Sequence, residues 1–235
     1  MRIISILMSR LMFCVLFCCS WAVEMYHAKM GSAEVVVLSL TRRDINTSIL
    51  LPQNDAEKNI IYQYRTPFNE HNIVLVKAPN YNLLVDTGFA STTTALQSAL
   101  KELGLQFGDI THVLITHGHG DHVGAILNEK GENNFPNATL MLDKKEYDFW
   151  AKSSNDTARK AFESFGDKRV FIEHNINLFP QSTLQIVASP AYGHTAGHIT
   201  VQFTHKDDTF IFFADLLHNF AVQTHGPQIS TTYDH

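Results

Sequence analysis

The stretch Thr116-His117-Gly118-His119-Gly120-Asp121-His122 holds three imidazoles and a carboxylate within six consecutive residues, interrupted only by glycines. It is a poor candidate for the protein core, because each buried polar side chain would need a partner. It is also a poor helix or strand interior, because each glycine weakens both. The stretch therefore predicts a tight loop that directs several nitrogen and oxygen atoms towards one point.

The spacing within this stretch is typical of a metal site. His117 and His119 lie two residues apart, so in extended backbone both rings point to the same face. Asp121 and His122 follow after another glycine and turn towards a neighbouring position, and the ions of two-metal sites lie roughly 3.5–4 Å apart. Because the ligands are mainly imidazoles, zinc is favoured over magnesium or calcium.

The composition narrows the class of protein. The chain has 235 residues, 45% of them hydrophobic, and a formal net charge of −5, which fits one well-cored domain or two halves that share a site. No basic stripe indicates nucleic-acid binding. Thirteen histidines are many for this length and favour a metal or acid–base site. The expected partner is a small-molecule substrate.

The N-terminus has the pattern of a signal peptide. Arginines precede a short apolar run at residues 11–19, and Ser20 and Ala22 supply the small residues of a cleavage site. We expect residues 1–22 to be removed and residues 23–235 to form a secreted or periplasmic domain without a membrane span. The apolar run is short for a span, and an uncleaved anchor is the alternative.

All three cysteines of the chain, Cys14, Cys18 and Cys19, lie within this N-terminal segment. The mature chain would therefore have neither disulfides nor thiolate ligands. Any metal ion must then be held by histidine and carboxylate side chains.

Hydrophobic runs alternate with polar loops and helical patterns along the chain. Strands are expected at residues 34–40, 72–77, 81–85, 109–116, 139–142, 184–188, 199–204 and 209–213. Helices are expected at residues 92–103, 123–129 and 143–152. Residues 41–60 have no assignment, and residues 153–167 are a candidate lid or linker. The order of strand, polar loop and helix occurs twice, which predicts an α/β sandwich with the site at strand ends between two halves.

Asp86, which follows the expected strand at residues 81–85, has two interpretations. An acid at the end of a buried strand and close to Gly88 can deliver a polar group to a site. The same residue can equally be a turn aspartate that caps the next helix. The sequence leaves both interpretations open.

Four motifs together resemble the metallo-β-lactamase-fold hydrolases. The opening stretch resembles the HxHxDH motif of that superfamily, and residues 84–88 resemble its upstream strand ending in Asp-x-Gly. Residues 194–198 resemble its His-Thr-Pro-Gly-His loop, with Ala196 in place of proline. Residues 213–218 resemble its Gly-Asp element, with Ala214 in the glycine position. The resemblance implies an αββα sandwich.

A weaker likeness concerns residues 215–223, which resemble the methyl-parathion-hydrolase-like and lactonase-like subgroup. The superfamily resemblance implies two zinc ions and assigns their ligands. His117, His119 and His194 would hold the first ion, Asp121 and His122 the second, and Asp215 would bridge them.

The resemblance also implies roles around the ions. Asp121 would accept or relay the proton of a metal-bound water, His198 would orient the loop that carries His194, and His218 would polarise a substrate carbonyl.

One departure from the superfamily pattern concerns the C-terminal part of the chain. Relatives usually supply a last histidine to the second metal, some forty or more residues beyond the residue matching Asp215. Here 20 residues follow Asp215. We therefore expect a C-terminally truncated chain, with an incomplete second half and an incomplete second metal position.

The expected function is metal-dependent hydrolysis of an ester-like bond in a lactone, phosphotriester, thioester or β-lactam. The nucleophile would be a zinc-activated water. Two alternatives remain open at this point. One is a mononuclear iron oxidoreductase of the same fold, and the other is a truncated metal-binding protein without turnover.

Overall fold

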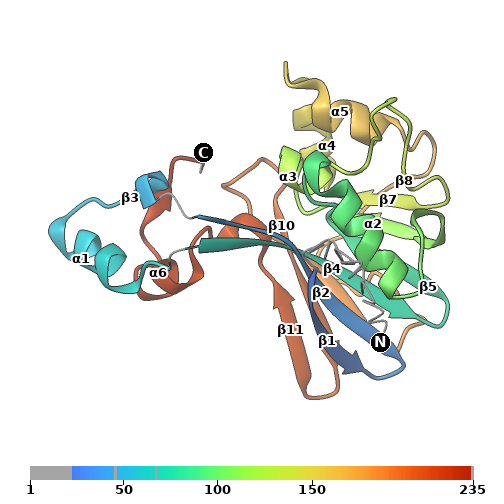
Figure 1. Ribbon diagram of the computed structural model, residues 1–235, viewed down its shortest axis with the longest axis horizontal. Helices are drawn as coiled ribbons and strands as arrows, with labels where there is room; N and C mark the ends of the chain where they lie inside the picture. Colours follow the sequence, from blue (N-terminus) through green and yellow to red (C-terminus); the bar gives the residue numbers. More distant parts are fainter. Residues whose placement is uncertain (1–22, 45–46, 67, 234–235) are drawn as a thin grey trace, which may run out of the picture.

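The computed structural model describes residues 23–44, 47–66 and 68–233, and the predicted signal peptide at residues 1–22 lies outside this described part. Two β-sheets pack face to face, and helices cover the outer face of the larger sheet (Figure 1). The larger sheet has seven strands in the order β1 (Glu24–Met30), β2 (Ala33–Asp44), β4 (Phe68–Ala78), β5 (Tyr81–Val85), β6 (His112–Leu114), β7 (Thr139–Leu142) and β8 (Arg169–Phe171).

The larger sheet changes its strand direction at β5. Strands β1, β2, β4 and β5 pair antiparallel, whereas β5, β6, β7 and β8 pair parallel. In β5, Leu83, Leu84 and Val85 are all buried, as expected for a strand covered on both faces. The sequence did not predict β1, because Met30 is its one buried residue and the strand shows no clear apolar alternation.

Four helices cover the larger sheet: α2 (Thr93–Glu102), α3 (Gly120–Val123), α4 (Lys144–Trp150) and α5 (Asp156–Glu163). Leu96 and Leu100 of α2 share one buried cluster with Val113 of β6. Residues 153–167, a candidate lid or linker from the sequence, contain α5, whose Phe162 belongs to the same cluster. This segment is therefore part of the helical layer.

The helix expected at residues 123–129 is wrong. In the structure α3 begins three residues earlier and ends at Val123. The N–H of Gly124 donates to the carbonyl of Gly88 at 2.9 Å, so the chain leaves the helix to pack against the loop that follows β5.

The smaller sheet has three strands in the order β11 (Asp208–Phe212), β10 (Ile199–His205) and β9 (Gln185–Pro190). Its inner face packs on the larger sheet, where Val74 of β4 shares a buried cluster with Ile186 of β9 and Phe203 of β10. On its outer face Gln202 and Ile211 are exposed. The structure thus confirms the mixed α/β sandwich and shows three of its expected layers in the order helices, large sheet, small sheet.

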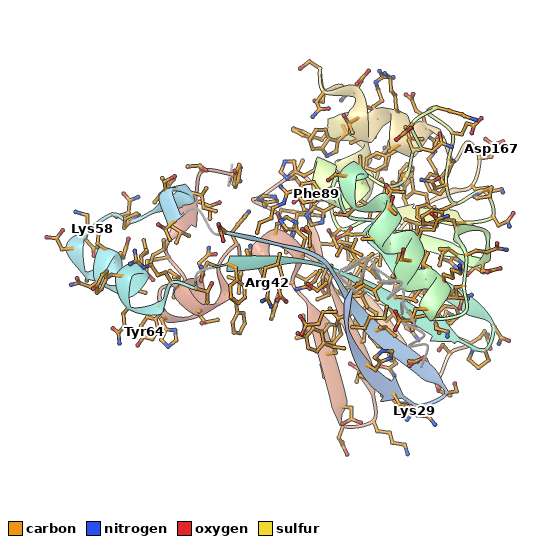
Figure 2. The ribbon with its side chains drawn as sticks, in the orientation of Figure 1. Lys29, Arg42, Lys58, Tyr64, Phe89 and Asp167 are labelled. Atoms are coloured by element: carbon orange, nitrogen blue, oxygen red, sulfur yellow. The ribbon has the colours of Figure 1, made fainter. Side chains whose placement is uncertain are left out.

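A separate lobe projects from the sandwich, at the left of Figure 1. Lys58 and Tyr64 mark this lobe in Figure 2. It consists of β3 (Leu50–Leu51), α1 (Asp55–Tyr64), α6 (Phe220–His225) and β12 (Ser230–Thr231). Leu50, Val222 and Ile229 form its small core. Within the described ranges, no helix is both long enough and apolar enough to cross a membrane.

The parallel strands end together at one edge of the larger sheet. Val85 of β5 is level with Leu114 of β6, which is level with Met141 of β7. Their C-terminal ends therefore deliver three consecutive loops to the same place, which is where open α/β sheets bind ligands.

Candidate metal centre

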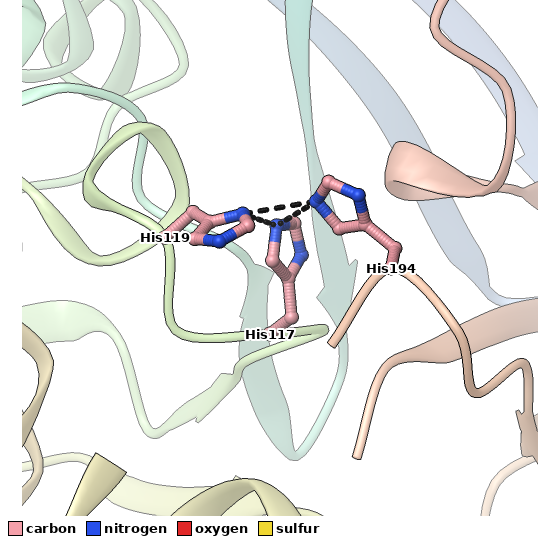
Figure 3. A group of neighbouring side chains, drawn as sticks. All are labelled: His117, His119 and His194. Carbon is pink, nitrogen blue, oxygen red and sulfur yellow. Dashed lines mark hydrogen bonds between the residues drawn. The ribbon is translucent and has the colours of Figure 1, made fainter. Parts of the chain in front are cut away.

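Three histidine side chains meet where the two halves of the fold come together (Figure 3). His117 and His119 follow β6, and His194 lies between β9 and β10. Nε2 of His117 is 3.1 Å from Nδ1 of His119 and 3.2 Å from Nε2 of His194. The latter two nitrogens are 2.9 Å apart. One nitrogen from each ring therefore faces a single point.

These three nitrogens fit a metal ion. Zinc–nitrogen bonds of about 2.0–2.1 Å in a tetrahedron would place the nitrogens roughly 3.3 Å apart. Burial lowers the pKa of His119, lowers that of His117 well below its usual value, and lowers the pKa of His194 to about 4. The rings are therefore neutral near pH 7, and their lone pairs are available to a cation.

A second group of ligand atoms lies beside the first. Nε2 of His122 is 3.2 Å from Oδ1 of Asp215 and 3.6 Å from Oδ2 of Asp121. The other oxygen of Asp215, Oδ2, is 3.5 Å from Nε2 of His194 and 3.9 Å from Nε2 of His117. The two oxygens of Asp215 thus face the two positions separately, which suits a bridging carboxylate.

The electrostatics of this second group also suit a cation. Burial alone would raise the pKa of Asp215, but His122 and His117 hold it well below its usual range. Burial alone would lower the pKa of His122, but Asp215 and Asp86 hold it well above its usual value. Among the described residues, Nε2 of His122 is buried and has no hydrogen-bond partner. A positive charge between His122 and Asp215 is therefore stabilised, whether it is a proton or a metal ion.

The buried carboxylate of Asp86 sets which nitrogen each histidine presents. It accepts hydrogen bonds from the N–H and hydroxyl of Thr116, at 2.8 and 2.7 Å, and from Nδ1 of His122 at 2.8 Å. His122 therefore carries its proton on Nδ1 and presents Nε2 to the second position. Because the Thr116 hydroxyl donates to Asp86, its oxygen accepts from Nδ1 of His117 at 3.2 Å, which leaves Nε2 of His117 as the ligand atom.

Of the two interpretations of Asp86, the structure supports the role at the site. The short 3-10 turn at Ala90–Thr92 follows Phe89, α2 follows Thr92, and neither cap uses the Asp86 side chain. Asp86 also has a φ of 62°, in the sparsely populated left-handed region, and strained residues of this kind cluster at active sites.

A second buried carboxylate, Glu146 of α4, ties the two histidine loops together. Oε1 accepts from the N–H of Gly118 at 2.7 Å and from Nε1 of Trp150 at 2.6 Å. Oε2 accepts from the hydroxyl of Thr195 at 2.7 Å and from the N–H of Gly197 at 2.8 Å. Hydrogen bonds to a charged group contribute about 1.5–3 kcal/mol each. Glu146 could not be singled out from the sequence, because no local pattern distinguishes it from any other helical glutamate.

The glycines of the two loops allow this close approach. A Cβ at Gly118 would lie 2.3 Å from Nε1 of Trp150, and a Cβ at Gly197 would lie 2.3 Å from the backbone nitrogen of Glu146. A Cβ at Gly120 would meet nothing within 4 Å. The first glycine of the HxHxDH motif is therefore required by packing, and the second is not.

His198 positions Asp215. Its Nδ1 donates to the carbonyl of Ala191 at 3.0 Å, so its Nε2 accepts the N–H of Asp215 at 3.2 Å. Burial lowers the pKa of His198 to about 4, which keeps this acceptor neutral. The preceding Ala214 has a φ of 48°, in the region that favours glycine, which explains why the family motif has glycine there.

The centre opens into a cleft of about 810 Å³. His218 lines it, with Nε2 3.6 Å from Oδ2 of Asp215. Both ring nitrogens of His218 are buried and lack a hydrogen-bond partner in the described part of the chain. Phe89, Phe213 and Phe220 give the same cleft apolar surface, beside polar side chains such as those of Arg43 and Glu70.

Of the other histidines that the structure describes, His225 and His205 lie away from the centre, whereas His71 lies beside it. His225 stacks on Tyr64 in the lobe with ring centres 3.6 Å apart, and Nδ1 of His205 contacts the carbonyl of Thr183. His71 of β4, which the sequence analysis did not single out, lines the cleft with Nδ1 3.5 Å from Oδ2 of Asp121. It belongs to no motif, and only the pairing of strands places it here.

The comparison with known families agrees with this geometry. The model of the metallo-beta-lactamase superfamily matches residues 66–234, well over half of the chain. The chain belongs to the metallo-β-lactamase superfamily.

Several members of the superfamily are similar in sequence. Metallo-beta-lactamase domain-containing protein 1 of Xenopus laevis is 30% identical over 131 residues, which are 55% of this chain and 46% of that protein. Hydroxyacylglutathione hydrolase of Rhizobium johnstonii is 31% identical over 161 residues, with 63% and 52% covered. N-acyl homoserine lactonase AttM of Azorhizobium caulinodans is 32% identical over 108 residues, with 42% and 38% covered. The chain spans about half the length of the first two of these relatives.

Solved structures of the superfamily share the fold. The dizinc quorum-quenching lactonase AidC superposes with a TM-score of 0.76 at 24% identity, covering 91% of this chain and 81% of AidC. The hydrolase AbOPH superposes with a TM-score of 0.72 at 22% identity, covering 89% and 80%. At these identities the likeness shows the metallo-β-lactamase fold and nothing finer.

Replacing Asp86 with asparagine should weaken metal binding. Asp86→Asn removes the charged acceptor that fixes the tautomers of His117 and His122, and loss of such an outer partner costs about 10–100-fold in metal affinity. Competition with a chromophoric chelator measures the change. Asp109→Asn, which alters a carboxylate in a surface turn, is the control and should leave affinity unchanged. Equal affinities of both variants would contradict the role of Asp86.

Gly118→Ala should destabilise the fold, whereas Gly120→Ala should not. The first substitution forces a methyl group into Trp150, and overpacking of this kind costs about 1–3 kcal/mol. The second adds a methyl group in open space, where effects stay within about 0.5 kcal/mol. Urea unfolding of both variants gives the free energies. If Gly118→Ala were as stable as Gly120→Ala, the Trp150 side chain would have moved at little cost, and the packing requirement at Gly118 would be wrong.

Proposed function

We propose that this chain is a zinc-dependent hydrolase that cleaves an ester-like bond in a small, largely apolar substrate. The observation that carries the proposal is the convergence of three neutral histidine nitrogens, within 3.2 Å of one another, beside a carboxylate that faces a second cation position. Imidazole and carboxylate ligands around an accessible cleft are typical of catalytic zinc sites.

The residues of the centre divide the work of hydrolysis. When bound, zinc lowers the pKa of a coordinated water from 15.7 to about 7, so that a nucleophile is available at neutral pH. Asp121 lines the cleft beside this position and can accept the water's proton. Asp215 would connect the two metal positions, because one of its oxygens faces each position.

His218 is the proposed stabiliser of the oxyanion. Its ring lies against those of His194 and Tyr233, with centres 4.9 and 5.7 Å away. Both ring nitrogens are buried, so the ring must turn towards the cleft before an N–H can donate to the oxygen of the scissile carbonyl as charge develops on it. This role suits a carbonyl substrate, because its oxygen becomes negatively charged when the nucleophile attacks.

The cleft walls support an apolar substrate. Phe213 and Phe220 are 37% and 64% exposed, so both offer ring surface to a ligand. Aromatic surface of this kind binds an apolar body, while the metal centre and the polar residues of the cleft orient the substrate. A lactone with an acyl chain and an aryl ester both have this character, and AttM and AidC are described as lactonases.

Hydrolysis should depend on the ligand histidines and on zinc. His117→Ala and His119→Ala each remove a ligand and should reduce activity on a panel of lactones and aryl esters to background. His205 is the last residue of β10 and lies away from the centre, so His205→Ala should retain nearly full activity. Initial rates before and after chelation, and after zinc is restored, measure the effect.

Three outcomes would contradict this proposal. Equal losses in all three variants would show that the histidine assignment is wrong. Native protein that contains iron, consumes oxygen and leaves the ester panel intact would instead be an oxidoreductase of the same fold. Protein that binds zinc without turning over any ester would be a metal-binding protein alone.

A further inference from the structure

His71 lies in the antiparallel part of the large sheet, far along the chain from the HxHxDH motif. It pairs with Thr41 of β2, immediately beyond an irregularity in the strand register between Ser39 and Thr41. Such bulges re-aim side chains and are common beside active sites. Here the irregularity accompanies a histidine that lines the metal cleft.

The neighbours of His71 are the ligands of the second metal position. Nδ1 of His71 is 3.5 Å from Oδ2 of Asp121, which is 3.6 Å from Nε2 of His122, which is 3.2 Å from Oδ1 of Asp215. Two ligand atoms of one zinc ion are separated by roughly 3.3 Å when each bond is about 2.0–2.1 Å. Successive atoms in this series therefore have nearly the spacing of neighbouring ligands.

The side chain of His71 packs against Phe89. Its ring packs on Phe89, with centres 4.6 Å apart and planes at 52°. The guanidinium group of Arg43 also lies over the Phe89 ring, with its Cζ 4.1 Å from the ring centre. Phe89 thus supports the His71 ring, and Nδ1 of that ring faces Asp121.

We propose that His71 is a protein ligand of the second metal ion, together with Asp121, His122 and Asp215. Distances of 3.5, 3.6 and 3.2 Å link the four atoms in succession, and rotations of the partly exposed Asp121 and His71 side chains would bring them around one divalent ion. The site would then take one histidine from a strand upstream of the motif. This inference rests on the metal centre of the proposed function.

Metal titration of the 235-residue chain tests the proposal. After chelation, the wild-type protein should take up two equivalents of cobalt(II), with the first held by His117, His119 and His194. In His71→Ala the first equivalent should bind as in the wild type, and the second should bind more than tenfold more weakly. His112→Ala, which removes another half-buried histidine of the same sheet, should bind both equivalents normally.

Proton NMR of the cobalt protein separates a ligand from a positioning residue. Each histidine ligand with an exchangeable ring N–H gives a strongly shifted signal that disappears in deuterium oxide. The second equivalent should add signals from His71 and His122 in the wild type, and His71→Ala should lack one of them. A residue that only positions Asp121 would leave the number of shifted signals unchanged.

The remaining outcomes are distinct. Equal affinity for the second equivalent in wild type and His71→Ala, or an unchanged number of shifted signals, overturns the inference and leaves the proposed function standing. Uptake of a single equivalent by the wild type also overturns the inference about His71 and leaves the proposed function standing. A wild-type chain that binds no metal overturns both.

Discussion

At the end of β5 the Asp86 carboxylate is fully buried and accepts hydrogen bonds from Thr116 and His122. Burying a charge is costly unless it is well paired, so this carboxylate requires its donors to stay in place. Through Thr116 it also orients His117, which serves the other metal position. One anion, held at the tip of a parallel strand in left-handed backbone, thus determines which nitrogens two metal positions receive.

Glu146 has the complementary role between the halves of the fold. Asp86 accepts hydrogen bonds from within the first histidine loop, whereas Glu146 joins that loop to the one that carries His194. Its four donors come from three separate segments of the chain, so the centre forms only when helices and both sheets have packed. The geometry of the centre is therefore coupled to the stability of the whole sandwich, as preorganised sites require.

The lobe and the smaller sheet form part of the cleft in front of the centre. Phe220 of α6 and Phe213 after β11 line a cleft whose other walls come from β2 and β4 of the larger sheet. These segments are distant in sequence and meet because β2 and β4 are long paired strands and because β12 pairs with β3. The same pairing brings His71 to Asp121, a contact that no local motif encodes.

The sequence by itself determined the elements that depend on local pattern. Apolar runs predicted most strands, and the motif glycines predicted the loop at residues 116–119, because turn chemistry and hydrophobic periodicity are local properties. Residues 120–122 were expected in the same loop but begin α3. The superfamily and its α/β fold followed from motifs in order, while the signal peptide at residues 1–22 and the truncation stay predictions. Only the tertiary structure decided the role of Asp86, the link through Glu146 and the place of His71. Each depends on partners far along the chain, and buried charges find those partners only once the sheets have packed.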